Sequence, residues 1–235
     1  MTKLSIITVA FNAQEALEST ILSVIGQSGV DVEYIVVDGG SNDATLDLIR
    51  KYEHKIKYWI SEPDNGIYDA MNKGVRLATG DWLLFMNAGD EFTSQSILSA
   101  VTNCINVNTD VIYSDWIYKE SGKTIKANFD KLNVRHQSVV YRKELHEKYG
   151  TYVVGKGVTI SDYIFFLSIA HKNWKYLAMP ISICEQVGAS SKPTHFYQRM
   201  AAELIFNRRS KLNACFILIV YPVYRFIKRS ILRFS

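Results

Sequence analysis

Hydrophobic and polar residues are arranged along the first part of the chain in blocks that predict strands and helices in turn. Apolar, β-branched runs at 4–9 and 33–37 predict buried strands, and a shorter strand is predicted at 57–61. The intervening segments 13–25 and 44–52 carry apolar residues at helical spacing and predict amphipathic helices. This β-α-β-α-β order predicts a doubly wound α/β fold with a mostly parallel sheet.

The most apolar segment, at 82–86, runs directly into a polar turn that ends in Asp90. A continuous apolar run of this length predicts a strand buried on both faces, and ligands of open α/β sheets bind at the carboxyl ends of such strands. A carboxylate at Asp90 can hold a divalent cation there. Asp38, after the strand at 33–37, can accept hydrogen bonds from a ribose or a base. Both acids are also common in solvent-exposed turns, so the sequence alone leaves that alternative open.

Asn65 and Gly66 precede a helix predicted at 67–78. A helix start has free backbone N–H groups, and a glycine there allows a phosphate to approach closely. No G-x-G-x-x-G sequence follows the first strand and no Walker A sequence is present, which argues against a dinucleotide-binding or P-loop protein.

The second half of the chain has a less regular pattern than the first. Its predicted elements are strands at 111–118, 124–128 and 138–141, helices at 143–149, 164–170 and 194–209, a hairpin turn at 119–123 and a loop at 150–157. Asp162 precedes the helix at 164–170, where it or Ser161 can act as the N-cap, a contribution of about 0.5–2 kcal/mol. Within the helix at 194–209, Glu203 can pair with Arg199.

The length of 235 residues and the hydrophobic content of 48% suit one large domain, alone or with an appendage. The three cysteines, Cys104, Cys184 and Cys215, form neither a disulfide framework nor a zinc-binding spacing, which indicates a reducing cytosol. Residues 1–9 lack a cleavage-site pattern and predict a strand and not a signal peptide.

The C-terminal segment carries the net positive charge of the chain. Residues 199–235 have a net charge of +7, so that the rest of the chain carries −3 of the total of +4. The apolar run at 214–224 is interrupted by Pro222 and is too short to span a membrane, which takes about 20 residues. Basic and apolar residues alternate from 225 to 234, which favours a helix in a membrane interface over a helix docked on the body or an oligomer contact. Nucleic-acid binding is disfavoured, because the basic residues lie in an apolar tail without a recognition motif.

Five blocks near the N-terminus match the sequence pattern of a known family, in the same order. They are 5–8 with 11–12 (SIIT, FN), 36–43 (VVDGGSND), 64–74 (DNGIYDAMNKG), 79–82 (TGDW) and 85–90 (FMNAGD). On these blocks the chain resembles the family 2 glycosyltransferases of the GT-A fold. The resemblance covers residues 3–92 and implies a GT-A, Rossmann-like, mostly parallel sheet with helices on both faces, followed by a C-terminal helical extension.

The resemblance also implies an organisation and an activity. Residues 1–190 would form the GT-A domain, with 1–92 as its nucleotide-binding half and 93–190 as its acceptor half, and 191–235 would form C-terminal basic amphipathic helices. The expected activity is inverting transfer of a sugar from a nucleotide diphosphate sugar, here a UDP-sugar, to a hydroxyl of a glycan or lipid-linked acceptor. Such enzymes usually use Mg or Mn.

By the same resemblance, the turn after the first strand and the acid after the second strand hold the nucleotide. These positions are occupied here by Val9, Phe11 and Asp38. The matching block at 64–74 adds three residues to the expected nucleotide-binding set: Asn65, Gly66 and Asn72.

The family's metal-binding D-x-D element departs from its pattern in this chain. It reads Ala88-Gly89-Asp90, so that only its last acid is present. One carboxylate can anchor Mg when water and diphosphate oxygens complete the shell, and weak or absent metal dependence is an open alternative.

A transferase of this kind needs a base for the acceptor hydroxyl. In the resembling family an acid at the position of Asp162, before a helix in the second half, has this role, and a capping position is compatible with it. His136 and Gln137 match a block that lies near the diphosphate or the acceptor, and we expect them to bind substrate. The other histidines show no partner spacing and are expected to be structural: His54, His146, His171 and His195.

The expected setting is polysaccharide biosynthesis at the inner, cytoplasmic face of the cell membrane, with the tail as a peripheral membrane contact. Two alternatives stay open. A sugar nucleotidyltransferase usually has a Gly-rich loop and a basic residue after the first strand, and both are missing from the turn at 9–12. A non-catalytic nucleotide- or glycan-binding subunit is favoured by the depleted D-x-D element and disfavoured by the joint presence of Asp38, Asp90 and Asp162.

Overall fold

The structure, a computed structural model, describes residues 3–185 and 193–213 of the chain. The predictions for the apolar and basic segments at 214–234 lie outside these residues. Within the described ranges, we find no helix with the length and apolar character needed to cross a membrane.

The described residues form one nine-stranded sheet and its covering helices. The strands are β1 (Leu4–Ala10), β2 (Val32–Asp38), β3 (Tyr58–Ser61), β4 (Trp82–Phe85), β5 (Glu91–Phe92), β6 (Val111–Tyr118), β7 (Thr124–Ile125), β8 (Val139–Arg142) and β9 (Trp174–Cys184). The α-helices are α1 (Leu17–Ile25), α2 (Thr45–Tyr52), α3 (Ile67–Leu77), α4 (Ile97–Cys104), α5 (Glu144–Tyr149), α6 (Ser161–Ser168) and α7 (Pro193–Ile205). Two short 3-10 helices are η1 (Glu53–Lys55) and η2 (His136–Ser138).

The sheet has the strand order β3-β2-β1-β4-β8-β6-β9-β5, with β7 added beside β6. The strands β1 to β4 are parallel, and Ile7 of β1 lies opposite both Ile35 of β2 and Phe85 of β4. β8 continues the sheet antiparallel to β4, with Leu83 opposite Tyr141. The predicted doubly wound parallel half is therefore confirmed, and the second half of the chain adds antiparallel strands to the same sheet.

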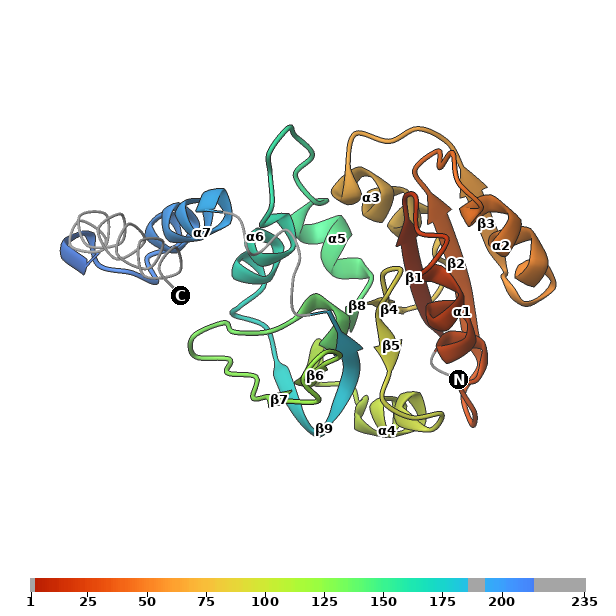
Figure 1. Ribbon diagram of the computed structural model, residues 1–235. Helices are drawn as coiled ribbons and strands as arrows, with labels where there is room; N and C mark the ends of the chain where they lie inside the picture. Colours follow the sequence, from red (N-terminus) through yellow and green to blue (C-terminus); the bar gives the residue numbers. More distant parts are fainter. Residues whose placement is uncertain (1–2, 186–192, 214–235) are drawn as a thin grey trace.

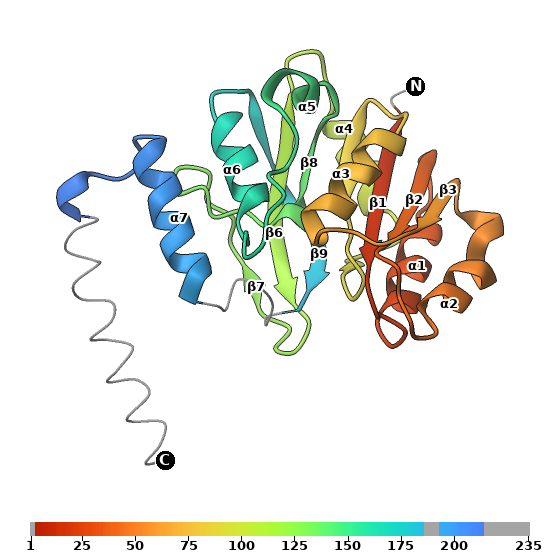
Figure 2. The same ribbon diagram turned by 90° about the horizontal axis from the view of Figure 1, so that it is seen from above.

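Helices cover both faces of the sheet, as predicted (Figures 1 and 2). On one face α3, α5 and α6 pack against strand residues such as Ile7 and Phe85. On the other face α1, α2 and α4 pack against the alternate residues, such as Ile6 and Leu84. Because successive strand residues point to opposite faces, a sheet covered on both sides needs the continuous apolar runs seen in the sequence.

α7 lies on the far side of the molecule from α2 and β3 (Figures 1 and 2). The predicted ion pair within it is present, with Arg199 Nε 3.1 Å from Glu203 Oε1. Glu203 also accepts a hydrogen bond from the Tyr163 hydroxyl of α6, at 2.9 Å. This contact joins α7 to the body of the domain.

Several predicted boundaries differ from the observed ones. α1 begins at Leu17 and not at residue 13, β7 covers only Thr124–Ile125 and not 124–128, and α7 ends at Ile205 and not at 209. The elements β5, α4 and β9 were not predicted. β9 contains Pro180, which weakens the strand signal because proline is uncommon within strands. The pairing of β9 with β6 shifts its register between Ser114 and Trp116.

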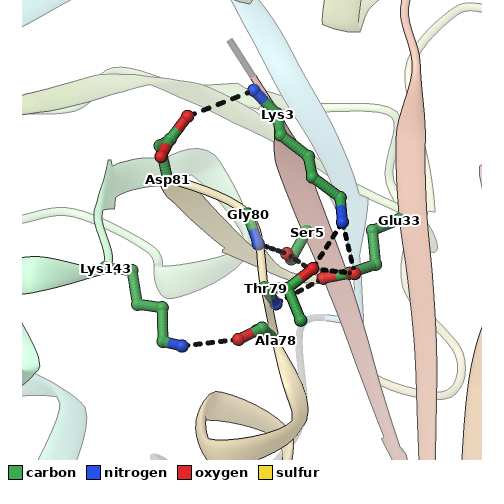
Figure 3. A network of polar contacts seen from close by, with 8 residues as sticks. All are labelled: Lys3, Ser5, Glu33, Ala78, Thr79, Gly80, Asp81 and Lys143. Atoms are coloured by element: carbon green, nitrogen blue, oxygen red, sulfur yellow. Dashed lines mark hydrogen bonds and ion pairs between the residues drawn. The ribbon is translucent and has the colours of Figure 1, made fainter.

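The buried carboxylate of Glu33 joins β2 to the amino end of β1 and to the turn before β4 (Figure 3). Its side chain is 1% exposed and accepts hydrogen bonds from the Lys3 ammonium at 2.8 Å, the Ser5 hydroxyl at 2.6 Å and the Thr79 backbone N–H at 2.6 Å. Burial raises the pKa of Glu33, but the hydrogen bonds from Lys3, Ser5 and Thr79 outweigh it and lower the pKa from 4.5 to about 2. The ionised form of Glu33 therefore stabilises this end of the sheet.

We expect Glu33→Gln to lower the free energy of unfolding at pH 7 by about 2 kcal/mol. The pKa shift alone corresponds to about 3 kcal/mol, and solvent screens part of it because Lys3 is 41% exposed. Since the folded-state pKa is depressed, the stabilisation is present above pH 4.5 and is lost as the pH falls toward 2. The difference between wild type and variant in the free energy of unfolding, measured with urea, should therefore shrink below pH 4.5.

Glu62→Gln is the matched control for this prediction. Glu62 pairs with Lys73 at 2.8 Å, but its side chain is 55% exposed. Such surface pairs contribute about 0–1 kcal/mol. Equal losses of stability in Glu33→Gln and Glu62→Gln would contradict the role of Glu33.

Candidate active site

A cavity of about 1040 Å³ lies beyond the carboxyl end of β4. Its walls come from the start of α3, the turn after β4, the segment 130–137, the start of α6, and α7. The cavity is lined by Asp90, His136, Gln137 and Asp162, among others. The structure thus brings together the residues predicted to bind the metal, to act as base and to bind substrate, although they come from separate parts of the chain.

Asp162 lies in the first turn of α6, which begins at Ser161. The residue before this helix is Ile160, and no side chain caps the helix start. The prediction that Ser161 or Asp162 is the N-cap was therefore wrong, because the helix begins earlier than predicted. Ser161 Oγ instead accepts a hydrogen bond from the backbone N–H of Val153. The Asp162 carboxylate is left to line the cavity.

Two side chains hold the Asp162 carboxylate. The Tyr68 hydroxyl donates to Oδ1 at 2.8 Å, and His136 Nδ1 lies 3.0 Å from Oδ2. Burial raises the pKa of Asp162, but the hydrogen bond and charge of His136, together with the Tyr68 bond, outweigh it and leave the pKa below its usual value. Asp162 is therefore ionised at neutral pH, which is the state that a general base needs.

His136 connects Asp162 to the turn after β4. Its Nε2 lies 2.9 Å from Asn87 Nδ2. Its Nδ1 donates to Asp162 Oδ2 at 3.0 Å. His136 was predicted to bind substrate; in the structure it lines the cavity and also orients the Asp162 carboxylate.

Asp90 is 6% exposed and lines the same cavity. Its Oδ2 accepts a hydrogen bond from Gln137 Nε2 at 2.5 Å. Burial raises the pKa of Asp90 above its usual value, and the Gln137 bond and the charges of His136 and Arg135 offset this only in part. A positive ion beside Asp90 would favour its charged form.

The predicted nucleotide-binding residues are not among those that line the cavity. Asp38 is fully buried at the carboxyl end of β2. Its Oδ2 accepts hydrogen bonds from the N–H groups of Gly40 at 3.2 Å and Ser41 at 3.0 Å and from the Ser61 hydroxyl at 2.7 Å. Asp38 therefore shapes the turn after β2 in this structure.

Phe11 has the opposite environment, with 63% of its surface exposed. It lies beside the turn after β2, since a Cβ added to Gly39 would come within 3.3 Å of the Phe11 ring and 2.4 Å of Asp64 Oδ2. A side chain at position 39 would require the Asp64 carboxylate to move. The exposed ring is available for stacking on a planar group such as a base.

The start of α3 differs from the prediction. The N–H of Asn65 donates to Asp69 Oδ2 at 3.0 Å, and that of Gly66 donates to Asp64 Oδ1 at 2.7 Å. These two N–H groups are therefore not free for a phosphate, because local carboxylates already occupy them. Gly66 has a φ of 104° and open space where a Cβ would lie.

Val9 and Asn72 are part of the packed interior. Val9 is 6% exposed and belongs to the core on the α3 face of the sheet. Asn72 is 5% exposed, and its amide donates to the Tyr152 carbonyl and accepts from the Tyr152 N–H, both at 2.9 Å. With both amide atoms bonded to the Tyr152 backbone, Asn72 joins α3 to the loop before α6.

Two of the histidines expected to be structural, His146 and His195, have different environments. His146 is 5% exposed, bonds the Tyr141 hydroxyl at 2.9 Å and the Gly150 carbonyl at 3.1 Å, and has its pKa lowered to about 4 by burial. His195 of α7 instead lines the cavity. Its Nδ1 donates to the Thr159 carbonyl at 3.1 Å.

Comparison with known proteins assigns the chain to a family. Residues 5–167 match the family model described as Glycosyl transferase family 2. The chain belongs to this family. A PGL/p-HBAD biosynthesis glycosyltransferase of Mycobacterium bovis is 35% identical over 159 residues, which cover 63% of this chain and 62% of that protein. The uncharacterized glycosyltransferase YibD of Escherichia coli is 27% identical over 126 residues, or 52% of this chain and 37% of that protein. These matches span less than two thirds of the relatives' lengths.

Solved structures share the fold at low sequence identity. S. aureus TarS (residues 1–349) in complex with UDP-GlcNAc is similar with a TM-score of 0.73 at 19% identity, over 91% of this chain and 68% of that chain. The mannosyltransferase PcManGT of Pyrobaculum calidifontis, in complex with GDP-Man and Mn²⁺, is similar with a TM-score of 0.61 at 16% identity, over 88% and 65% of the two chains. The predicted GT-A fold of a family 2 glycosyltransferase is thus confirmed.

The donors around Asp90 suit the divalent cation that this family implies. In residues 3–185 and 193–213 no group of three or more His, Cys, Asp or Glu side chains is arranged to hold a metal ion. Asn87 and Gln137 line the same cavity as Asp90, and their side-chain oxygens Oδ1 and Oε1 are buried without a hydrogen-bond partner. Mg and Mn accept carboxylate and carbonyl oxygens, with water and substrate oxygens completing the shell. These residues fit a weakly held cation whose coordination the substrate completes.

Proposed function

We propose that this chain transfers a sugar from a nucleotide diphosphate sugar to an acceptor hydroxyl, with inversion of configuration. The observation that carries the proposal is that Asp162 and Asp90 line one cavity but have opposite pKa shifts. Asp162 is kept ionised by its partners, as a base requires, whereas Asp90 is destabilised when charged, as a cation ligand without its cation would be. Two carboxylates in one site with divergent environments indicate divided roles.

The proposed reaction is a single displacement. Tyr68 and His136 hold the Asp162 carboxylate in place, and this carboxylate removes the proton of the acceptor hydroxyl. The acceptor oxygen attacks the anomeric carbon from the face opposite the nucleotide, the nucleoside diphosphate leaves, and the configuration inverts. Asp90 would hold a divalent cation, which would supply positive charge for the leaving diphosphate. General-base assistance contributes about 10²–10⁴-fold to such a step.

A UDP-sugar is the donor that we propose. The support is the structural likeness to TarS, whose complexes contain UDP and UDP-GlcNAc. The exposed Phe11 ring, beside the Asp38 turn, offers a place for the base. The likeness to a mannosyltransferase complex with GDP-Man makes GDP the nucleotide to compare.

A glycan or lipid-linked acceptor at the inner face of the cell membrane is the second part of the proposal. The similar Mycobacterium bovis protein has a name that refers to PGL/p-HBAD biosynthesis. Residues 199–235 carry a net charge of +7, which would attract them to anionic lipid. The basic segment supports the membrane location, and polysaccharide biosynthesis is the setting that we propose for the reaction.

The proposal is tested by measuring nucleoside diphosphate release from a panel of UDP- and GDP-sugars, with membrane extracts as the source of acceptor. We expect release from one donor class that depends on acceptor, and a product whose anomeric proton coupling shows inversion. Nucleotide binding without release or transfer from any donor would favour the non-catalytic binding subunit instead.

Tyr68→Phe tests whether the base is oriented as proposed. We expect kcat to fall by about 10-fold, with KM for the donor unchanged, because only the hydroxyl bond to Asp162 is lost. Loss of a bond to the ionised form raises the pKa of Asp162, so the acid limb of the kcat/KM profile should move to higher pH. Tyr149→Phe is the control, since its hydroxyl bonds His171 outside the cavity. A weaker donor affinity with an unmoved acid limb would refute this role for Tyr68.

A further inference from the structure

Four buried side-chain atoms in the described part of the chain have no hydrogen-bond partner: Asn87 Oδ1, Trp116 Nε1, Arg135 Nε and Gln137 Oε1. All four belong to residues that line the cavity of Asp90 and Asp162. Buried polar atoms are almost always paired, because each unpaired one costs about 1–3 kcal/mol. Their concentration in one cavity therefore indicates that a polar ligand completes it.

The two unpaired donors come from separate elements of the cavity wall. Trp116 is near the carboxyl end of β6, and Arg135 directly precedes η2. One arm of the Arg135 guanidinium is fixed, since Nη2 donates to the Glu185 carbonyl at 2.8 Å. Arg135 lines the same cavity as Asp90, the carboxylate proposed to hold the cation. Trp116 can only donate at Nε1, so its missing partner is an acceptor.

The other arginines along the cavity are already engaged. Arg199 and Arg209 both pair with Glu203, at 3.1 and 2.5 Å. Arg208 donates to the Asp130 carbonyl at 3.2 Å and stacks on a phenylalanine ring. Among the described arginines that line the cavity, Arg135 is thus the one with a buried N–H that lacks a partner.

We propose that Arg135, assisted by the Trp116 indole N–H, binds the diphosphate of the donor. This inference rests on the proposed function and adds to it a second source of positive charge for the leaving group. Guanidinium N–H groups form short, charge-assisted hydrogen bonds to phosphate oxygens. Arg135 would supply positive charge to the diphosphate in addition to any cation held by Asp90, the one acid present in the D-x-D element. Nucleotide binding then persists in part without metal.

The test is calorimetric titration in EDTA of wild type, Arg135→Gln and Lys131→Gln. Lys131→Gln is the matched control, because Lys131 also lines the cavity and its replacement removes the same charge. The probes are UDP, uridine and inorganic pyrophosphate. We expect Arg135→Gln to weaken the affinity for UDP and pyrophosphate by about 10–100-fold, as expected for a lost hydrogen bond to a charged group. The affinity for uridine should not change. Lys131→Gln should bind all three as wild type does.

Trp116→Phe provides an independent variant that removes the N–H and keeps the ring. It should weaken UDP by about 3–10-fold, and it decides the question if Arg135→Gln does not fold. Unchanged UDP and pyrophosphate affinities in the folded variants overturn the inference. A loss of uridine affinity equal to the loss of UDP affinity also overturns it. If wild type binds pyrophosphate through Arg135 but binds no nucleotide, the anion site stands and the proposed function fails. If UDP binds without regard to Arg135, the inference fails and the proposed function stands.

Discussion

Replacing Asp162 with asparagine is expected to lower kcat by about 10²–10⁴-fold, the usual contribution of general-base catalysis. The amide has the shape of the carboxylate but cannot take a proton from the acceptor. Its oxygen can still accept the Tyr68 bond, which is 2.8 Å long in the wild type. The fold and the nucleotide affinity should therefore be preserved. The measurement is the rate of nucleoside diphosphate release at saturating donor and acceptor, together with calorimetric binding of the nucleotide.

Asp130→Asn is the control for this variant. Asp130 lines the same cavity, so its replacement removes the same charge from the site. We expect its kcat to stay within about 2-fold of wild type, as for substitutions that touch no special feature. Near-wild-type turnover in Asp162→Asn, or equal losses in both variants, would show that Asp162 is not the base.

Asp90→Asn is expected to remove cation binding and to lower kcat/KM by about 10²–10³-fold, since a cation contributes several kcal/mol to such a step. The same substitution should raise the melting temperature of the metal-free protein. Burial raises the pKa of Asp90, so its ionisation opposes folding above that pKa, and asparagine removes this cost. The gain should vanish as the pH falls and the wild-type carboxyl becomes protonated. Manganese titration followed by electron paramagnetic resonance, and calorimetric melting in EDTA, measure the two effects.

Asp130→Asn is again the control, because it removes the same negative charge as Asp90→Asn from a different place in the cavity. It should bind manganese as wild type does. Wild-type manganese affinity in Asp90→Asn would show that any cation lies elsewhere. A lowered melting temperature in EDTA would contradict the unfavourable burial of the Asp90 charge.

The parallel half of the fold could be predicted because its signals are local. β1, β2 and β4 are continuous apolar runs, and each requires only its neighbouring residues to be recognised. β9 carries no such signal: its burial is irregular and Pro180 lies within it, so its pairing with β6 depends on distant residues.

The sequence pointed to Asp90, Asp162, His136 and Gln137, which line one cavity, but not to Tyr68 or Arg135. Asp90 and Asp162 lie in recognisable sequence contexts, but Tyr68 meets Asp162 across 94 positions and the fold alone brings them together. The same holds for Arg135, whose unpaired N–H is a property of burial and not of sequence. The backbone N–H of Gly66 was expected to be free. It donates instead to the nearby Asp64 carboxylate, which is a local effect.

The central claim, that the cavity of Asp90 and Asp162 serves a nucleotide-sugar donor, is tested most directly by calorimetric titration of the wild-type chain with UDP and with GDP, in Mn²⁺ and in EDTA. We predict that UDP binds, that it binds more tightly with Mn²⁺, and that GDP binds more weakly. Failure of both nucleotides to bind under either condition would contradict the account.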